Sequence, residues 1–203
     1  MLFIEQLEVK AITAHGLSID AGECISLSGA SGMGKSLFMK GVADLVINRG
    51  TLLLDGAARS DMYIPDWRNR VTYVGAKPAW WCDLVSEHFN NPDWLASQLS
   101  AFDLPEKAIN WTVHRLSSGE AQRLALLRAL EESVEGVVRY LLLDEPTSAL
   151  DGLRQKQVES YLQDLLDDKK IAVLFVSHDE HQVKRFAQRH WQVYDRRVRE
   201  VSI

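Results

Sequence analysis

Residues 24–36 read CISLSGASGMGKS, an apolar run that leads into a glycine-rich loop closed by a lysine and a serine. Such a loop lets successive backbone N–H groups point at an anion, and a helix behind it adds its positive N-terminal end. Cys24–Leu27 predicts a strand before the loop, and Leu37–Val46 predicts a helix after it. The loop between them fits the G-x-x-x-x-G-K-[ST] pattern of a phosphate-binding P-loop: Gly29, Ala30, Ser31, Gly32, Met33, Gly34, Lys35 and Ser36.

The last two residues of this loop carry its predicted chemistry. Lys35 is expected to reach the β- and γ-phosphates of a nucleotide, and the Ser36 hydroxyl to bind Mg²⁺. The alternative is a glycine-rich turn with an exposed lysine, but the strand–loop–helix context favours the P-loop. A P-loop alone leaves kinases, GTPases and many motors open, so the rest of the chain has to decide.

Two acidic residues follow a second apolar run, Tyr140–Leu143. Asp144, at the tip of a buried strand, is expected to hold Mg²⁺ through water, as a Walker B aspartate does. Glu145 is expected to polarise the attacking water, its side chain diverging from that of Asp144 because neighbours in an extended segment alternate. The alternative is a pair of acids that only ends a strand, which the P-loop disfavours.

One histidine stands at the end of a further apolar run. His178 follows Ala172–Val176, and a neutral imidazole there could contact a γ-phosphate oxygen while holding Glu145 and the water in position. A lone histidine after a strand is more often structural. Its place on the strand after the acidic pair favours the catalytic interpretation.

The segment Leu116-Ser117-Ser118-Gly119-Glu120 opens a predicted helix, Ala121–Leu130. Free backbone N–H groups point outward at such a helix start, and Ser117 is a natural N-cap. Taken alone, this is an ordinary capping sequence. Its position between the P-loop and the acidic pair favours a functional role for the segment.

The order of these motifs resembles the ABC ATPase family over nearly all of residues 2–203. Leu116–Glu120 resembles the family's signature motif, Ser148–Asp151 its D-loop and His178 its H-loop. The resemblance implies a head-to-tail homodimer that encloses two ATP molecules. Each ATP would lie on one subunit's P-loop and be closed by Ser117 and Gly119 of the other, with Asp151 along the seam.

The fold expected from the residues and the resemblance is α/β, a P-loop NTPase of the ABC ATPase type. Buried runs separated by helices predict a mixed, mostly parallel sheet. These runs are Cys24–Leu27, Thr51–Leu54, Val71–Val74, Tyr140–Leu143 and Ile171–Val176. Alternating segments near both ends, the last of them Val198–Ile203, predict antiparallel additions. We expect a single domain, 1–203, with a short helical subdomain at about 78–135 inserted in a RecA-like core, and Pro92 and Pro105 in first turns of helices.

Some positions depart from the family pattern. Ala76 stands where the resemblance places a glutamine that touches Mg²⁺ and the attacking water. The aromatic residue that stacks on adenine is missing, with His15 as a weak replacement. Ser118 and Glu120 are milder changes in the signature motif. Turnover is still expected, because the phosphate, Mg²⁺ and catalytic residues are all present.

Charge and the length of the apolar runs limit the classes of partner that the chain is expected to bind. The chain has 203 residues and a net charge of -5, which gives no general attraction to nucleic acid, so no direct nucleic-acid contact is expected. Its apolar runs are too short to cross a bilayer, which needs about 20 residues. We therefore expect an ATPase subunit on the cytoplasmic face of a membrane, peripheral to a separate permease. Its compact size resembles the small ATPases of metal export.

The alternative is a non-transport ABC ATPase that acts on nucleic acid, the ribosome or a protein complex. Members of that class usually carry tandem cassettes or long inserts, which this chain lacks. Four of the six tryptophans (Trp80, Trp81, Trp94 and Trp111) lie in the predicted helical insert, where the resemblance implies docking of a permease. Adjacent Trp80 and Trp81 cannot easily both point inward, so one of them is expected to line a docking groove.

Overall fold

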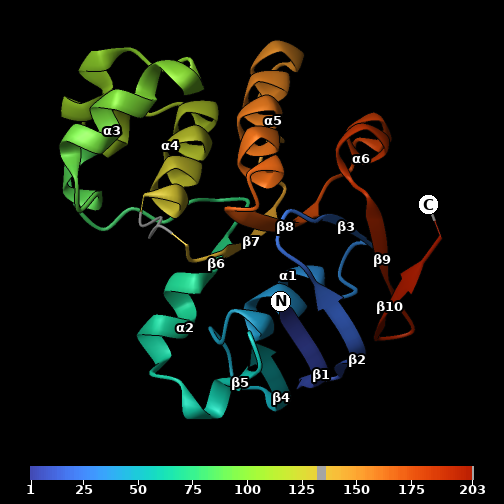
Figure 1. The fold of residues 1–203 in the computed structure, drawn as a ribbon. Helices are drawn as coiled ribbons and strands as arrows, with labels where there is room; N and C mark the ends of the chain where they lie inside the picture. The colour runs from blue at the N-terminus through green and yellow to red at the C-terminus, as the bar shows by residue number, and fades with distance from the viewer. Residues whose placement is uncertain (132–135, 203) are drawn as a thin grey trace.

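The computed structural model of the protein describes residues 1–131 and 136–202 (Figure 1). The expected limit of the helical subdomain at residue 135, and Ile203 at the end of the expected last strand, lie outside these residues. A single mixed sheet runs through the described part of the chain. Its strands are β1 (Leu2–Val9), β2 (Ile12–Ile19), β3 (Cys24–Ser28), β4 (Arg49–Leu54), β5 (Ala57–Ala58), β6 (Val71–Val74), β7 (Arg139–Asp144), β8 (Ile171–Val176), β9 (Arg189–Tyr194) and β10 (Arg197–Val201).

The strand order is β5-β4-β1-β2-β10-β9-β3-β8-β7-β6. The half from β9 to β6 is entirely parallel, as the apolar runs predict. β7 and β8 are buried along their whole length. On β7, Tyr140 and Leu142 pack into one core, and Leu141 and Leu143 pack into the other. Helices therefore cover both faces of this half of the sheet, as parallel sheets require.

The other half of the sheet is mostly antiparallel. β1 pairs with β2 and β4, β4 with β5, and β9 with β10, all antiparallel. The expectation that Thr51–Leu54 belongs to the parallel set is wrong, because this run is part of β4. Only Leu52 and Leu54 of β4 are buried, which is the alternation of a strand with one solvated face.

The helices lie on both sides of the sheet (Figure 1). α1 and α2 pack on one side, against the core that holds Phe38 and Trp67, and the other helices pack on the opposite side. The Trp67 indole donates to the Val42 carbonyl at 3.0 Å, which ties α2 to α1. The helices are α1 (Lys35–Val42), α2 (Ile64–Arg70), α3 (Pro92–Gln98), α4 (Ser118–Leu130), α5 (Gly152–Asp167) and α6 (Glu180–Phe186).

Local signals placed the starts of several helices. Ser117 caps α4, as predicted, and a capping box with Glu120, which was not predicted, starts the helix at Ser118 instead of Ala121. Pro92 lies in the first turn of α3, as predicted, and Asn91 caps that helix. The helix after the P-loop ends at Val42 rather than Val46, because Asp44 adopts a left-handed backbone with φ 56°. Pro105 stands just before a short 3₁₀ helix instead of inside a first turn.

Between β6 and β7 the chain forms a helical insertion, whose apolar side chains belong to the core under α4 and α5. Trp111 is buried in that core and Trp94 packs against it, whereas Trp81 is 68% exposed. Short 3₁₀ helices occur here and after β5: η1 (Arg59–Asp61), η2 (Ser86–His88), η3 (Leu99–Phe102), η4 (Glu106–Asn110) and η5 (Val113–Arg115).

Among the helices of the described residues, none combines the length and the apolar character needed to span a bilayer.

Candidate nucleotide site

The P-loop joins the end of β3 to the start of α1, as predicted. Gly29 has φ 145°, and a Cβ there would lie 2.8 Å from the Val193 carbonyl oxygen of β9. Gly34 has φ 94° and packs against Ile12, whose Cδ1 would lie 2.0 Å from an added Cβ. Only glycine fits these two positions. The Lys35 ammonium group donates to the Gly29 carbonyl at 2.7 Å and so spans the loop that its backbone encloses.

The two predicted Mg²⁺ ligands, Ser36 and Asp144, meet at a tyrosine that the sequence reasoning missed. The Tyr73 hydroxyl of β6 donates to Asp144 Oδ2 at 2.8 Å, and Ser36 lies close enough to the same hydroxyl to lower the pKa of Tyr73. Burial, and then the contact with Asp144, raise the pKa of Tyr73. A hydroxyl and a carboxylate oxygen are the hard ligands that Mg²⁺ prefers. The residues present therefore fit the ion.

Glu145 and His178 lie side by side because β7 and β8 are parallel neighbours, with Asp144 opposite Val176. His178 Nε2 is 3.1 Å from Glu145 Oε1. Glu145 is not extended, as the sequence reasoning assumed, but has a left-handed backbone with φ 51°. That conformation, rather than strand alternation, separates its side chain from that of Asp144. The pair lines a cavity of about 340 Å³ with Ser148 and Gln182.

A carboxylate next to an imidazole is suited to activating water. A neutral imidazole can donate Nε2–H to Glu145 and fix the direction of the carboxylate, which still has lone pairs free to accept a proton. His178 is itself 68% exposed, so its ring can reach a ligand in the cavity. The structure brings the two residues together as predicted, and their catalytic roles stay predictions.

The signature-like segment and the D-loop share a second surface. Ser117 and Gly119 stand at the exposed start of α4, and a Cβ on Gly119 would lie 3.0 Å from the Ala149 carbonyl oxygen. Asp151 caps α5 and accepts from the Leu153 and Arg154 backbone N–H groups at 3.1 and 3.0 Å. The Arg154 backbone hydrogen bond is the largest cause that lowers the pKa of Asp151.

This second surface and the P-loop are not joined within the chain. No hydrogen bond or ion pair in residues 1–131 and 136–202 links Ser117, Gly119 or Asp151 to residues 29–36. Ser117, Gly119 and Asp151 instead line a cavity of about 250 Å³ of their own. The structure therefore assembles the predicted residues into two separate half-sites.

His15, the weak candidate for stacking on adenine, lies on the exposed face of β2. It lines a cavity of about 520 Å³ with Thr13, Arg197 and Arg199. In the described part of the chain, no P-loop residue borders that cavity. The structure does not bring His15 to the phosphate cradle.

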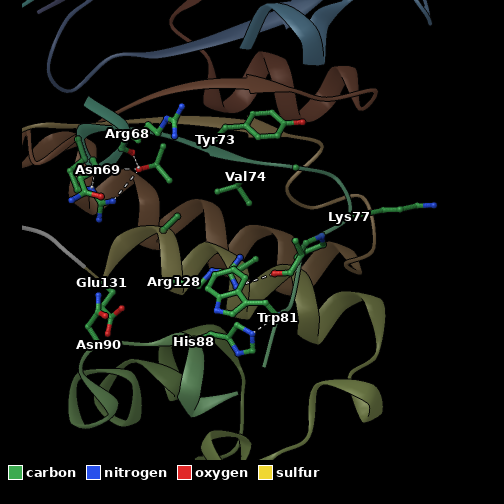
Figure 2. A pocket seen from close by; sticks show the side chains of 17 residues that line it. Arg68, Asn69, Tyr73, Val74, Lys77, Trp81, His88, Asn90, Arg128 and Glu131 are labelled. Carbon is green, nitrogen blue, oxygen red and sulfur yellow. Dashed lines mark hydrogen bonds between the residues drawn. The ribbon is translucent and has the colours of Figure 1, made fainter. Parts of the chain in front are cut away.

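A groove of about 440 Å³ is lined by residues of α2, β6, the loop after β6 and α4 (Figure 2). Trp81 lines this groove, as expected of one of the paired tryptophans, and docking of a permease there stays a prediction. The Arg128 guanidinium lies 4.8 and 4.6 Å from the ring centroids of Trp80 and Trp81. His88 Nε2 accepts from the Trp81 backbone N–H at 2.9 Å. The His88 ring also packs edge-on against the Trp81 ring, with centroids 4.7 Å apart, so the exposed Trp81 ring contacts both Arg128 and His88.

Comparison with known proteins gives a consistent result. The family described as ABC transporter matches residues 12–148. The probable iron export ATP-binding protein FetA of Escherichia coli (strain K12) is 32% identical over 187 residues, which cover 87% of this chain and 81% of that protein. The lipoprotein-releasing system ATP-binding protein LolD of Leptospira interrogans is 31% identical over 194 residues, covering 84% and 76% respectively.

A solved structure shares the fold. It is a dimeric structure of a post-hydrolysis state of the ATP-binding cassette MJ0796 bound to ADP and Pi. The similarity has a TM-score of 0.81 at 24% identity and covers 100% of this chain and 98% of the other. At 24% identity, this similarity shows that the two chains share a fold.

Proposed function

Because the chain belongs to the ABC transporter family of ATP-binding subunits, we propose that it closes on Mg²⁺-bound ATP as a head-to-tail homodimer and so drives a separate membrane permease. The chain is an ATPase, and its relatives are named as subunits of export, release and import systems. The alternative of a non-transport ABC ATPase is not favoured by those names. The likeness to a probable iron-export subunit agrees with the predicted resemblance to small metal-export ATPases.

The observation that carries the homodimer is the separation of the two half-sites. One chain offers a phosphate cradle on Lys35 and Ser36, and elsewhere an exposed helix start at Ser117 and Gly119, and the described residues show no hydrogen bond between the two. A helix N-terminus attracts anions. Two chains arranged head to tail would bring the cradle of one against the helix start of the other. A γ-phosphate between them would bridge the subunits, and its loss would reopen the dimer.

Each residue of the cradle then has a definite role. Lys35 and the P-loop backbone N–H groups bind the phosphates. Ser36 and Asp144 would hold Mg²⁺, which neutralises charge on the phosphate oxygens. Glu145 accepts a proton from the attacking water, and His178 orients Glu145 through the 3.1 Å contact. Asp151 would lie along the seam between the subunits.

The groove beside Trp81 is the proposed docking surface for the permease. Aromatic side chains are favoured as anchors of interfaces, and this one is exposed yet fixed by Arg128 and His88. The proposed location is the cytoplasmic face of a membrane, peripheral to the permease. The proposed organisation is one domain over residues 1–203, with the helical subdomain at about 78–135.

The test uses one variant of the P-loop, Lys35→Ala, and one of the acidic pair, Glu145→Gln. Glu145→Gln should stop hydrolysis but still bind ATP, so size-exclusion chromatography with light scattering should show ATP-dependent dimers. Lys35→Ala should show neither turnover nor dimers. A Glu145→Gln variant that stays monomeric at saturating ATP would contradict the head-to-tail dimer.

The same Glu145→Gln protein tests the partner. Purified from its own cell in mild detergent, it should bring a multi-span membrane protein with it. A ribosome, a nucleic acid or a soluble complex in its place would leave the ATPase standing and overturn the transport proposal.

A further inference from the structure

One buried side chain of α4 contacts both the loop after β6 and the loop between β7 and α5. Gln122, on α4, is 4% exposed. Its Nε2 lies 3.4 Å from the Ala76 carbonyl oxygen, 3.3 Å from the Glu145 carbonyl oxygen and 3.0 Å from Ser148 Oγ. Its Oε1 accepts from the Ala149 backbone N–H at 3.1 Å. Both ends of the amide are therefore used, and they link the loop after β6, the catalytic glutamate and the D-loop.

The contact with Glu145 matters because that residue has a strained backbone. A non-glycine residue at φ 51° costs about 1–2 kcal/mol and persists only where its surroundings hold it. Three donors converge on the Glu145 carbonyl: Gln122 Nε2, Ser148 Oγ at 3.1 Å and Ser148 N at 3.3 Å. The direction of this carbonyl and the direction of the side chain are set by the same backbone dihedrals. Donors on the carbonyl therefore also fix where the side chain leaves the backbone, from which the carboxylate reaches His178.

We propose that Gln122 is a positioning residue for ATP hydrolysis, which holds Glu145 in its left-handed conformation and ties it to the orientation of α4. This inference rests on the proposed function. A movement of the helical insertion would reach Glu145 through the Gln122 amide. It would also reach the loop at Ala76 through a backbone carbonyl, so this connection needs no side chain at position 76.

The competing explanation is that Gln122 only satisfies buried polar groups and stabilises the fold. The two explanations differ in kinetics. A positioning residue acts on the chemical step and lowers kcat, while contacts that bind ATP on the P-loop, and with them KM, are left in place. A purely structural residue lowers the amount of folded enzyme and leaves kcat per folded molecule unchanged.

The test compares Gln122→Met and Gln122→Glu with a matched control, Gln98→Met. Met keeps the length of the side chain without its polar atoms, and Glu keeps an acceptor for the Ala149 N–H but loses the donors. Gln98 is a partly buried glutamine of α3, whose Oε1 accepts from the Tyr161 hydroxyl at 2.7 Å. Both Gln122 variants should lose roughly tenfold to a hundredfold in kcat, with KM for ATP changed less than about threefold. The control should keep both constants within about twofold.

Three results would overturn the proposal. One is a folded Gln122→Met protein with kcat within about threefold of wild type. Another is a loss of activity that follows the folded fraction, or that Gln98→Met shares. The third is normal kcat in Gln122→Glu, since the donors would then be unnecessary.

A further variant keeps the test open if the Gln122 variants do not fold. Ser148→Ala changes an exposed residue and removes the hydroxyl that contacts both Gln122 and the Glu145 carbonyl. It should lower kcat about threefold at unchanged KM, and an unchanged kcat would overturn the proposal. Failure of the proposed function looks different, because the wild type itself would then lack ATP turnover.

Discussion

Replacing Tyr73 by phenylalanine should destabilise the nucleotide-free protein by an amount that follows from one hydrogen bond. The substitution removes the hydroxyl that donates to Asp144 Oδ2 at 2.8 Å, and it keeps the ring under Lys40, whose ammonium lies 5.4 Å from the ring centroid. Asp144 is only 7% exposed, so its carboxylate loses a donor in a buried place. Hydrogen bonds to charged groups contribute about 1.5–3 kcal/mol.

We expect a loss near the lower end of that range. Tyr73 is half-buried, so water can replace part of the missing contact and the free energy of unfolding should fall by about 1.5 kcal/mol. For a chain of this length, about 2–4 °C of Tm accompanies each kcal/mol, which gives a decrease of about 3–6 °C. Thermal and urea unfolding at neutral pH, without nucleotide, would measure it.

The matched control lies on the neighbouring strand. The Tyr140 hydroxyl is buried and, within the described residues, has no hydrogen-bond partner. Tyr140→Phe also removes a tyrosine hydroxyl, but no hydrogen bond is lost. The free energy of unfolding of this variant should therefore stay level or rise by up to about 1 kcal/mol. A Tyr73→Phe protein that melts within about 1 °C of wild type, or that changes by as much as Tyr140→Phe, would refute the reasoning.

Two more perturbations test the strand tyrosines and the altered loop. Burial raises the pKa of Tyr140 to about 12, above the value near 10 of an unfolded chain. Stability from its neutral form is therefore complete below about pH 10 and is lost as pH rises towards 12, so Tyr140→Phe should lose less stability than wild type over that interval in urea titrations. Equal losses would contradict this assignment. Ala76→Gln restores the residue that the family resemblance places in the loop, and it should raise kcat by about twofold to tenfold at saturating ATP; an unchanged rate would show that the missing glutamine matters little here.

Features that depend on neighbouring residues in the chain could be predicted from the sequence. The P-loop lies between a strand and a helix because its glycines, lysine and serine are adjacent to those patterns. The start of α4 follows from Ser117 and Glu120, which cap the helix within one turn. Glu145 lies next to His178 because each follows a buried strand, and these two strands are parallel neighbours that end at the same edge of the sheet.

Features that depend on distant segments could not. The run Thr51–Leu54 reads as a buried strand whichever direction its neighbour takes, and its antiparallel partner β1 is set by the whole sheet. Tyr73 belongs to no motif, and its role becomes visible only when β6 lies beside β7 with Tyr73 opposite Leu142. The left-handed backbone of Glu145 likewise depends on donors from α4 and the D-loop.

The position of β3 in the sheet has a consequence for how the protein folds during synthesis. β3 leads into the P-loop, yet its two neighbours are β8 and β9, and the Cys24 backbone N–H bonds to Gln188 across a separation of 164 residues. Contacts between such distant segments form slowly. A nascent chain that ends before β8 leaves both edges of β3 unpaired, which is the state in which strands aggregate.

ATP cannot stabilise the nascent chain before β8 and β9 have been made. A ligand stabilises only those conformations that contain its binding site. The P-loop and β3 are synthesised early. Both strands that pair with β3 are present only after residue 194 has been added, at the end of β9. Nucleotide binding therefore cannot protect β3 from aggregation before β8 and β9 have been made.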